Sequence, residues 1–269
     1  MLRLEFAHHT DPGKLRAHNE DALGWCAPAV QGGDWLFVLA DGVGGQDAGE
    51  LASRWTVETL TGDFTRGELA LAPRLRQLLQ AANQRLHDAG LSGEFGKGMA
   101  STVVACALSR DRAIIAHAGD SRCYLRRRGE LRQLTQDHTF AAEQQALGLL
   151  SGDEPGWLPA RGCLSRSLGN DLFVQPELRE LRLEPGDLLL LSSDGLHGAL
   201  EGPRPGAAAS TRLARQLASP LPLPELAQHL VELARDVDGG DNISVLLIRI
   251  LEVERLGMYR GRPYRLPGS

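Results

Sequence analysis

The segment FVLADGVGGQDAGE, residues 37–50, is an apolar run that reaches Asp41 and continues into glycines and two further acids. Its apolar beginning is typical of a buried strand. A carboxylate next to such a strand is costly to bury unless a cation or hydrogen bonds compensate it. The Asp-Gly pair therefore has two interpretations: a turn or helix cap, or an acid that binds a cation beside closely approaching backbone. The pair alone favours the turn, and the rest of the chain has to decide.

The composition is that of an ordinary globular protein, with 269 residues of which 42% are hydrophobic and 23% charged. The net charge of −5 argues against nucleic acid or an anionic membrane as a general partner. The four cysteines stand far apart without a CxxC pair, so free thiols in a reducing compartment are expected rather than a zinc site. No signal peptide and no apolar run of about 20 residues is present. These features predict a soluble cytoplasmic protein without a membrane span.

Apolar periodicity predicts strands that come in adjacent groups. Strands are expected at 2–10, 22–26, 35–40, 101–109, 112–119, 122–134, 177–193 (two strands around a turn) and 242–250, and helices at 49–60, 73–90 (ended by Gly90), 139–148 and 223–237. Grouped strands favour an α+β protein with two packed, mostly antiparallel sheets flanked by helices over a doubly wound parallel sheet. Residues 149–163 and 202–210 are expected to be surface loops. The predicted domain covers residues 1–250, and the tail 251–269 is expected to pack weakly.

Acidic residues stand at the edge of an apolar strand in four further stretches. They are Glu20 with Asp21, Asp120, Asp194, and Asp241 with Asn242. If these strand ends converge, the carboxylates meet in one cleft, where divalent cations would have to neutralise them. Oxygen ligands suit Mg²⁺ or Mn²⁺ rather than zinc. Each stretch alone is more simply a turn, a cap or a solvated strand end, but five such stretches in one chain predict a metal centre.

Eight motifs follow one another in a fixed order. They are T-D-x-G-x-x-R-x-x-N-E-D at 10–21, A-D-G-x-G-G at 40–45, G-x-x-S-T-x-V at 98–104, H-x-G-D-S-R-x-Y at 117–124, T-x-D-H at 135–138, L-S-R-S-L-G at 164–169, S-S-D-G-L at 192–196, and an approximate G-G-x-D-N-I-S at 239–244. The set resembles the type 2C metal-dependent Ser/Thr protein phosphatases in their bacterial form. The resemblance extends from about residue 3 to residue 250 and implies the αββα sandwich of that family.

The resemblance also implies the roles of individual residues. Two core Mn²⁺ or Mg²⁺ ions would be held by Asp21, Asp41, the carbonyl of Gly42, Asp194 and Asp241, with Glu20 acting through water. Asp120 matches the ligand of a weaker third ion, Arg16 matches the residue that grips the substrate phosphate, and Asn242 matches a supporting neighbour. Arg16, Asp41 and Asp194 are therefore the expected catalytic residues.

The activity implied is hydrolysis of phosphoserine and phosphothreonine by direct attack of a hydroxide held between two metals. No covalent phosphoenzyme forms in such a mechanism, so Ser121 and Cys123 are not expected to act as nucleophiles. The expected partners are phosphorylated proteins and a cognate bacterial Ser/Thr kinase, and the expected state is a monomer. A pseudophosphatase should lack metal ligands, and none is missing here. A two-metal nuclease would need a basic track for its substrate.

Some positions depart from the family pattern. Val43 stands where many eukaryotic members have a histidine proposed as a general acid, and His197 and Gly198 follow the second Asp-Gly pair. Residues 149–163 correspond to the mobile flap of the family. His117 is expected to be a core histidine, and His138 a structural hydrogen-bonding residue rather than a catalyst.

Overall fold

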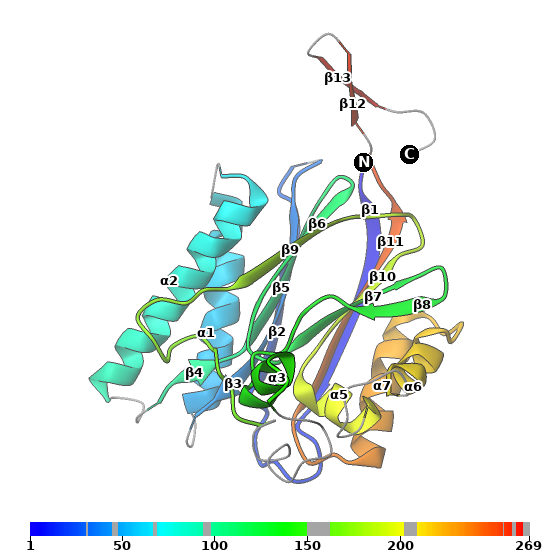
Figure 1. Ribbon diagram of the computed structural model, residues 1–269. Helices are drawn as coiled ribbons and strands as arrows, with labels where there is room; N and C mark the ends of the chain where they lie inside the picture. The colour runs from blue at the N-terminus through cyan, green and yellow to red at the C-terminus, as the bar shows by residue number, and fades with distance from the viewer. Residues whose placement is uncertain are drawn as a thin grey trace.

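Two antiparallel sheets form the centre of the protein (Figure 1). The computed structural model describes residues 1–30, 32–44, 48–66, 69–93, 98–149, 162–201, 209–254, 256–259 and 262–265. One sheet has the order β1-β11-β10-β7-β8, and the other has the order β2-β3-β5-β6-β9 with β4 paired to β3. Every strand pair in the two sheets is antiparallel. The predicted fold class is confirmed.

The strands of the first sheet are β1 (Arg3–Asp11), β11 (Ile243–Glu252), β10 (Leu188–Ser192), β7 (Arg122–Arg127) and β8 (Glu130–Gln133). Those of the second are β2 (Asp21–Cys26), β3 (Trp35–Val43), β4 (Ala100–Ser101), β5 (Val103–Ser109), β6 (Arg112–Ala118) and β9 (Glu177–Arg182).

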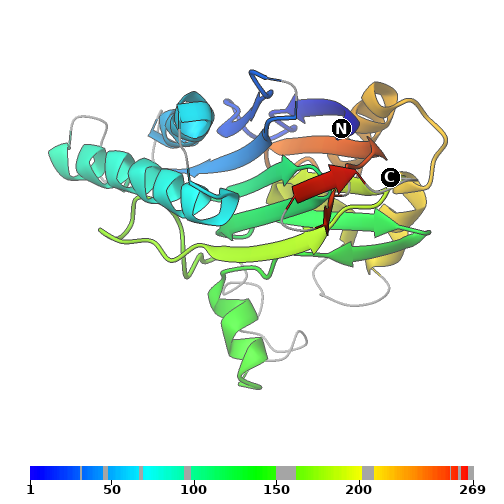
Figure 2. The same cartoon turned by 90° about the horizontal axis from the view of Figure 1, so that it is seen from above.

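Helices cover both outer faces of the sheet pair. The helices α1 (Ala48–Asp63) and α2 (Leu71–Ser92), with the short 3-10 turn Phe64–Arg66 between them, pack on the second sheet. The helices α5 (Asp194–Glu201), α6 (Ala209–Leu217) and α7 (Leu223–Val237) pack on the first. The helix α3 (Phe140–Ala146) extends away from both sheets (Figure 2).

The two-residue period of β3 explains how the layers are held together. Phe37 and Leu39 point into the core between the sheets, whereas Leu36, Val38 and Ala40 pack with α1 and α2. All five residues are fully buried. Because the strand is apolar on both faces, it forms the middle of a four-layer arrangement rather than the surface of a two-layer one.

The structure corrects three details of the sequence prediction. The helix α2 continues past Gly90 to Ser92 and ends at Gly93, which has a left-handed φ of 70°. The strand β10 ends at Ser192, and Asp194 is the first residue of a helix that was not predicted from the sequence. The helix α6 was also missed, because its first residues belong to a stretch expected to be a loop.

The chain after β11 forms a small two-stranded ribbon. The strand β11 runs two residues past the expected boundary at 250, and β12 (Leu256–Tyr259) pairs with β13 (Arg262–Arg265). This ribbon projects beyond the end of the sheets in Figure 1. Among the described residues, no helix has the length and apolarity needed to cross a membrane.

Removing a side chain from between the sheets should be costly. Leu191 is fully buried there, so Leu191→Ala should lower the free energy of unfolding by about 2–5 kcal/mol in urea titrations. Leu251, which is 37% exposed on β11, is the matched control, and Leu251→Ala should cost no more than about 0.5 kcal/mol. Equal losses in the two variants would show that the sheets are not held together by this core.

Candidate metal centre

Strand pairing brings the first two predicted acids together. Asp21 begins β2 and lies opposite Asp41 of β3 in the antiparallel register. The strand β3 does not stop at Asp41 as expected but continues to Val43, because Gly42 and Val43 pair with β4. Asp41 is therefore a residue near the end of a strand rather than part of a simple turn.

Two of the other acids reach the same place from the first sheet, and a third follows a strand of the second sheet. Asp194 follows β10 as the first residue of α5, and Asp241 lies just before β11. Asp120 follows β6. One cleft of about 420 Å³ is lined by Arg16, Glu20, Asp41, Gly42, Asp120, Asp194 and Asp241, among other residues. The structure thus collects residues separated by more than two hundred positions at one edge of the sandwich.

Asn242 organises the loop that carries the first acids. Its Oδ1 accepts a hydrogen bond from the Glu20 N–H (2.8 Å), and its Nδ2 donates to the carbonyls of Pro12 and His18 (both 2.9 Å). Its own N–H donates to Asp241 Oδ1 at 2.9 Å. Through these hydrogen bonds, the buried side-chain amide of Asn242 joins the β1–β2 loop to the acid before β11, which is the kind of supporting role expected for it.

Two glycines allow the backbone to approach the acids closely. A Cβ on Gly42 would collide with the carbonyl oxygen of Gly49, and a Cβ on Gly49 would collide with the Glu20 carboxylate. The Gly42 N–H donates to the Glu20 carbonyl at 3.0 Å. Glycine is required at both positions because the start of α1 packs directly on the loop that carries the acids.

The carboxylates are held in an environment that disfavours their charge. Burial raises the pKa of Asp21 to about 7, with further increases from Asp194 and Asp241 that oppose hydrogen bonds from serines. Burial raises the pKa of Asp41 well above its usual range, and Asp21, Asp194, Asp120 and Asp241 raise it further. The mutual repulsion shows that these groups form one electrostatic unit.

Positive charge and hydrogen bonds compensate this cluster only in part. Arg16 Nη2 donates to Asp241 Oδ2 at 2.9 Å, and that hydrogen bond raises the pKa of the guanidinium. Ser193 Oγ donates to Asp21 Oδ2 at 2.8 Å. The other oxygen, Asp21 Oδ1, is buried and has no hydrogen-bond partner within the described part of the chain. An orphaned buried carboxylate oxygen among further carboxylates fits a hard divalent cation such as Mg²⁺ or Mn²⁺.

Known proteins share this architecture. A family model described as protein phosphatase 2C matches residues 14–233. Protein phosphatase PhpP of Streptococcus pneumoniae is 32% identical over 253 residues, which are 93% of this chain and 98% of that relative. The chain belongs to the protein phosphatase 2C family.

Solved structures agree with this assignment. The serine/threonine phosphatase of S. agalactiae has a TM-score of 0.81 and 32% identity, covering 93% of this chain and 100% of that chain. The catalytic domain of the phosphatase PstP, solved with two manganese ions, has a TM-score of 0.78 and 31% identity, covering 94% and 100%. The family deduced from the motifs is confirmed.

The two side chains that were excluded as nucleophiles are poorly placed for attack in this protein phosphatase 2C member. Cys123 is fully buried in the core between the sheets, and burial raises the pKa of its thiol well above the usual range. Ser121 Oγ lies 2.7 Å from Thr102 Oγ1, to which the Asp41 N–H also donates (3.1 Å). Thr102 therefore links the backbone of Asp41 to the turn that carries Asp120, a role that its place in a motif could have indicated.

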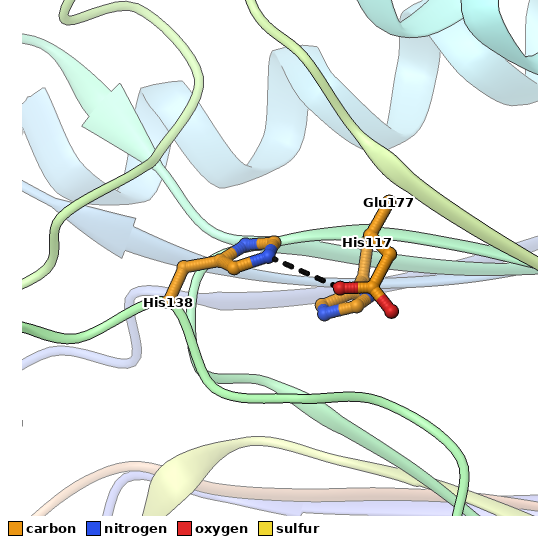
Figure 3. Close-up of side chains that lie close together, drawn as sticks. All are labelled: His117, His138 and Glu177. Atoms are coloured by element: carbon orange, nitrogen blue, oxygen red, sulfur yellow. Dashed lines mark ion pairs between the residues drawn. The ribbon is translucent and has the colours of Figure 1, made fainter. Parts of the chain in front are cut away.

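Three residues behind the Asp120 turn lie close enough to be considered as a second metal site. Figure 3 shows His117, His138 and Glu177; His138 Nε2 lies 3.7 Å from Glu177 Oε2, and the two form an ion pair only when the imidazole is protonated. The two imidazoles stack in parallel, with centroids 4.6 Å apart and an angle of 5°. Lone pairs in parallel planes cannot both meet one ion at about 2 Å. Both histidines are buried, so the core position predicted for His117 is confirmed.

The expected flap, residues 149–163, lies almost entirely outside the described residues. Phe140 N–H donates to the Cys163 carbonyl at 3.0 Å, which connects the start of α3 to the far side of that segment.

The acid cluster should make the cation-free protein less stable as the pH rises. The Asp21 pKa of about 7 exceeds its unfolded value of about 3.9, so folding favours the protonated carboxyl. Its contribution to stability is fully present below about pH 4 and is lost as the pH rises through about 7. In EDTA, the free energy of unfolding should therefore fall over this range, and Asp21→Asn should reduce the fall. The control Asp88→Asn, on the exposed side of α2, should retain the wild-type slope. Identical slopes in all three proteins would contradict the assignment.

Proposed function

We infer that this member of the protein phosphatase 2C family is a protein serine/threonine phosphatase that depends on Mn²⁺ or Mg²⁺. The observation that carries the inference is the convergence of carboxylates from both sheets in one cleft, with Arg16 at its edge. The relatives named as serine/threonine phosphatases cover nearly the whole chain. Phosphate esters and clustered acids repel one another, so cations between them are a physical requirement of this chemistry.

We propose that the residues predicted from the motifs hold these ions. Asp21, Asp41, Asp194, Asp241 and the Gly42 carbonyl supply oxygen ligands for two core ions, and Glu20 contributes through water. Bound there, the ions supply an activated water and stabilise negative charge on the phosphoryl oxygens. The chain itself keeps its ligands apart and oriented through the Asn242 amide and the Ser193 hydroxyl.

Arg16 is the group of the chain that we assign to the substrate phosphate. Its guanidinium is about half exposed at the cleft, and its hydrogen bond with Asp241 orients it towards the acids. A planar guanidinium matches two oxygens of a phosphoryl group, which a lysine cannot do. In this proposal, the substrate phosphate would lie between the Arg16 guanidinium and the core ligands.

Protonation of the leaving alkoxide requires another group. Val43 lines the cleft and is 44% exposed, but it has no proton to give. Asp120 also lines the cleft, and burial followed by the charges of Asp194 and Asp137 raises its pKa well above the usual range. We propose that Asp120 with Asp194 holds a third, weaker ion at this side of the cleft.

Two alternatives are less well supported. A pseudophosphatase that only binds phosphoproteins would not need the expected ligands to converge, yet all of them line or adjoin one cleft. A two-metal nuclease would need basic side chains along its substrate path, and the net charge is −5. Hydrolysis of phosphopeptides would exclude the pseudophosphatase, and the absence of hydrolysis of nucleic acid would exclude the nuclease.

We further propose that the enzyme acts in the cytoplasm as a monomer, that residues 1–250 carry the catalysis, and that it opposes a bacterial Ser/Thr kinase. A deletion strain should accumulate phosphoserine and phosphothreonine on the proteins of one kinase pathway, measured by phosphoproteomics. Sedimentation of the purified protein measures its oligomeric state.

Loss of a core carboxylate should abolish turnover without unfolding the protein. Wild type should hydrolyse a phosphothreonine peptide with Mn²⁺ or Mg²⁺ and lose activity in EDTA. Asp41→Asn and Asp194→Asn should each lower kcat by about 100-fold or more and weaken calorimetric Mn²⁺ binding, since each removes a charged ligand. Their melting temperatures in EDTA should stay level or rise, because repulsion is relieved. Near-normal activity in both variants, with Asp88→Asn as the active control, would mean that the Asp-Gly pairs are only turns.

Loss of Asp120 should separate the third ion from the core pair. Asp120→Ala should keep tight Mn²⁺ binding and the fold, yet lower kcat and kcat/KM together by about tenfold or more, as expected when an interaction made only in the transition state is lost. Added Mn²⁺ should not restore the rate, because the ligand itself is absent. Wild-type kcat at saturating Mn²⁺ would remove Asp120 from the mechanism.

A further inference from the structure

The T-x-D-H motif, residues 135–138, is hydrogen-bonded to the H-x-G-D-S-R-x-Y motif, residues 117–124, which contains Asp120. Thr135 Oγ1 accepts a hydrogen bond from the Cys123 N–H at 3.1 Å. Arg122 donates to both oxygens of Asp137, at 2.8 and 2.6 Å. The T-x-D-H motif therefore makes specific contacts along the segment that contains Asp120. These contacts indicate that the T-x-D-H motif stabilises the conformation of the segment around Asp120.

The last member of the motif, His138, holds the residue directly before Asp120. The backbone N–H of His138 donates to the Gly119 carbonyl at 3.0 Å. In return, the Gly119 N–H donates to His138 Nδ1 at 3.2 Å, and this hydrogen bond is buried. Gly119 is thus held at both its donor and its acceptor, which fixes the direction in which the chain enters Asp120.

Gly119 has no room to move away from this contact. Its φ is +106°, in the region that favours glycine, and an added Cβ would lie 2.7 Å from Cβ of Thr102. Thr102 is itself hydrogen-bonded to Asp41, by its N–H to the Asp41 carbonyl at 2.8 Å. The turn before Asp120 therefore packs between Thr102, which is hydrogen-bonded to Asp41, on one side and His138 on the other.

The orientation of the His138 ring is set by its neighbours. It stacks on the His117 ring (Figure 3), with a centroid distance of 4.6 Å. His117 Nε2 donates to the Gln136 carbonyl at 2.8 Å. Both histidines are at least 95% buried. A ring held in this way presents Nδ1 to Gly119 and cannot rotate to solvent.

Two N–H donors lie against the His138 ring, one at each nitrogen. Arg166 Nη1 lies 3.0 Å from His138 Nε2, and the Gly119 N–H points at Nδ1, but a neutral imidazole accepts at one nitrogen only. Arg166 also donates to the Gln175 carbonyl at 3.1 Å, whereas the Gly119 N–H is turned into the interior. The direction of the Gly119 N–H is fixed by the backbone, so Nδ1 is the acceptor that this turn requires.

We propose that His138 is a positioning residue for the phosphatase reaction, acting through the Gly119 N–H to orient Asp120 in the cleft. The proposal rests on the proposed function and deepens it, since it assigns a role to a residue that touches neither the substrate nor a metal. The chemical requirement is an acceptor atom at the position of Nδ1. A bulky side chain without that atom would fill the space but not hold the turn.

Three variants test the requirement. Asn places an oxygen where Nδ1 stands, Gln places its oxygen farther along the side chain, and Leu has no acceptor. His138→Asn should keep kcat on a phosphothreonine peptide within about threefold of wild type, whereas His138→Gln and His138→Leu should lower it about tenfold or more with KM little changed. If His138→Leu were not to fold, the comparison of Asn with Gln, two amides that differ by one methylene, still decides. Equal kcat in the Asn and Gln variants overturns the proposal.

A double-mutant cycle separates positioning from general stability. If His138 acts through Asp120, His138→Gln should cost about tenfold in the wild-type background but less than about twofold in the Asp120→Ala background. A purely structural role would give the same loss in both backgrounds, and that outcome overturns the proposal.

Hydrogen exchange of the Gly119 amide provides a readout that needs no catalysis. Its protection in the metal-free protein should persist in His138→Asn and fall about tenfold or more in His138→Gln, while amides of the central strand β5 remain protected in both. If wild type hydrolyses no phosphoester, the proposed function fails, and this exchange pattern still supports the clamp on Gly119. Unchanged Gly119 protection in the Gln variant overturns the clamp even in an active enzyme.

Discussion

Repulsion among carboxylates in one desolvated cleft is the constraint on which the rest of this protein depends. Asp21 and Asp41 face each other across two paired strands, and burial together with the nearby acids raises the pKa of both groups. Such an arrangement of buried carboxylates does not stabilise the fold. It persists because the sheets around it are stabilised elsewhere, by the buried leucines, isoleucines and valines between and outside them. Apolar burial in the sandwich stabilises the fold and offsets the unfavourable burial of carboxylates at its edge.

The edge is rigid because polar groups of the backbone and side chains are satisfied around the acids. The Asn242 amide holds the β1–β2 loop, Ser193 holds one oxygen of Asp21, and Thr102 connects Asp41 to the next turn. His138 completes the arrangement on the side of Asp120. A buried network is favourable only when every member is paired, and Asp21 Oδ1, which has no hydrogen-bond partner in the described part of the chain, is an atom that a cation would satisfy.

Sequence reasoning predicted the fold class and the residues of the cleft because both depend on local signals. Apolar alternation indicates strands, and grouped strands indicate antiparallel sheets. It failed where tertiary contacts override local ones. No helix was predicted after Asp194, yet apolar residues such as Leu196 and Leu200 bury against α7 only if the segment is helical. Asp41 looked terminal, yet β4 extends the ladder by two residues.

The sequence by itself was enough to predict which residues bind a cation, because acids recur at the edges of apolar strands within motifs that follow a definite order along the chain. The tertiary structure alone decided which polar group each residue meets. Asn242 and Glu20 are 222 positions apart, and His138 and Gly119 belong to different motifs. Hydrogen-bond partners at such separation are selected by how sheets and loops pack, since a bond of about 3 Å depends on the exact placement of both backbones. The motifs contain these residues, but only packing brings their donors and acceptors together.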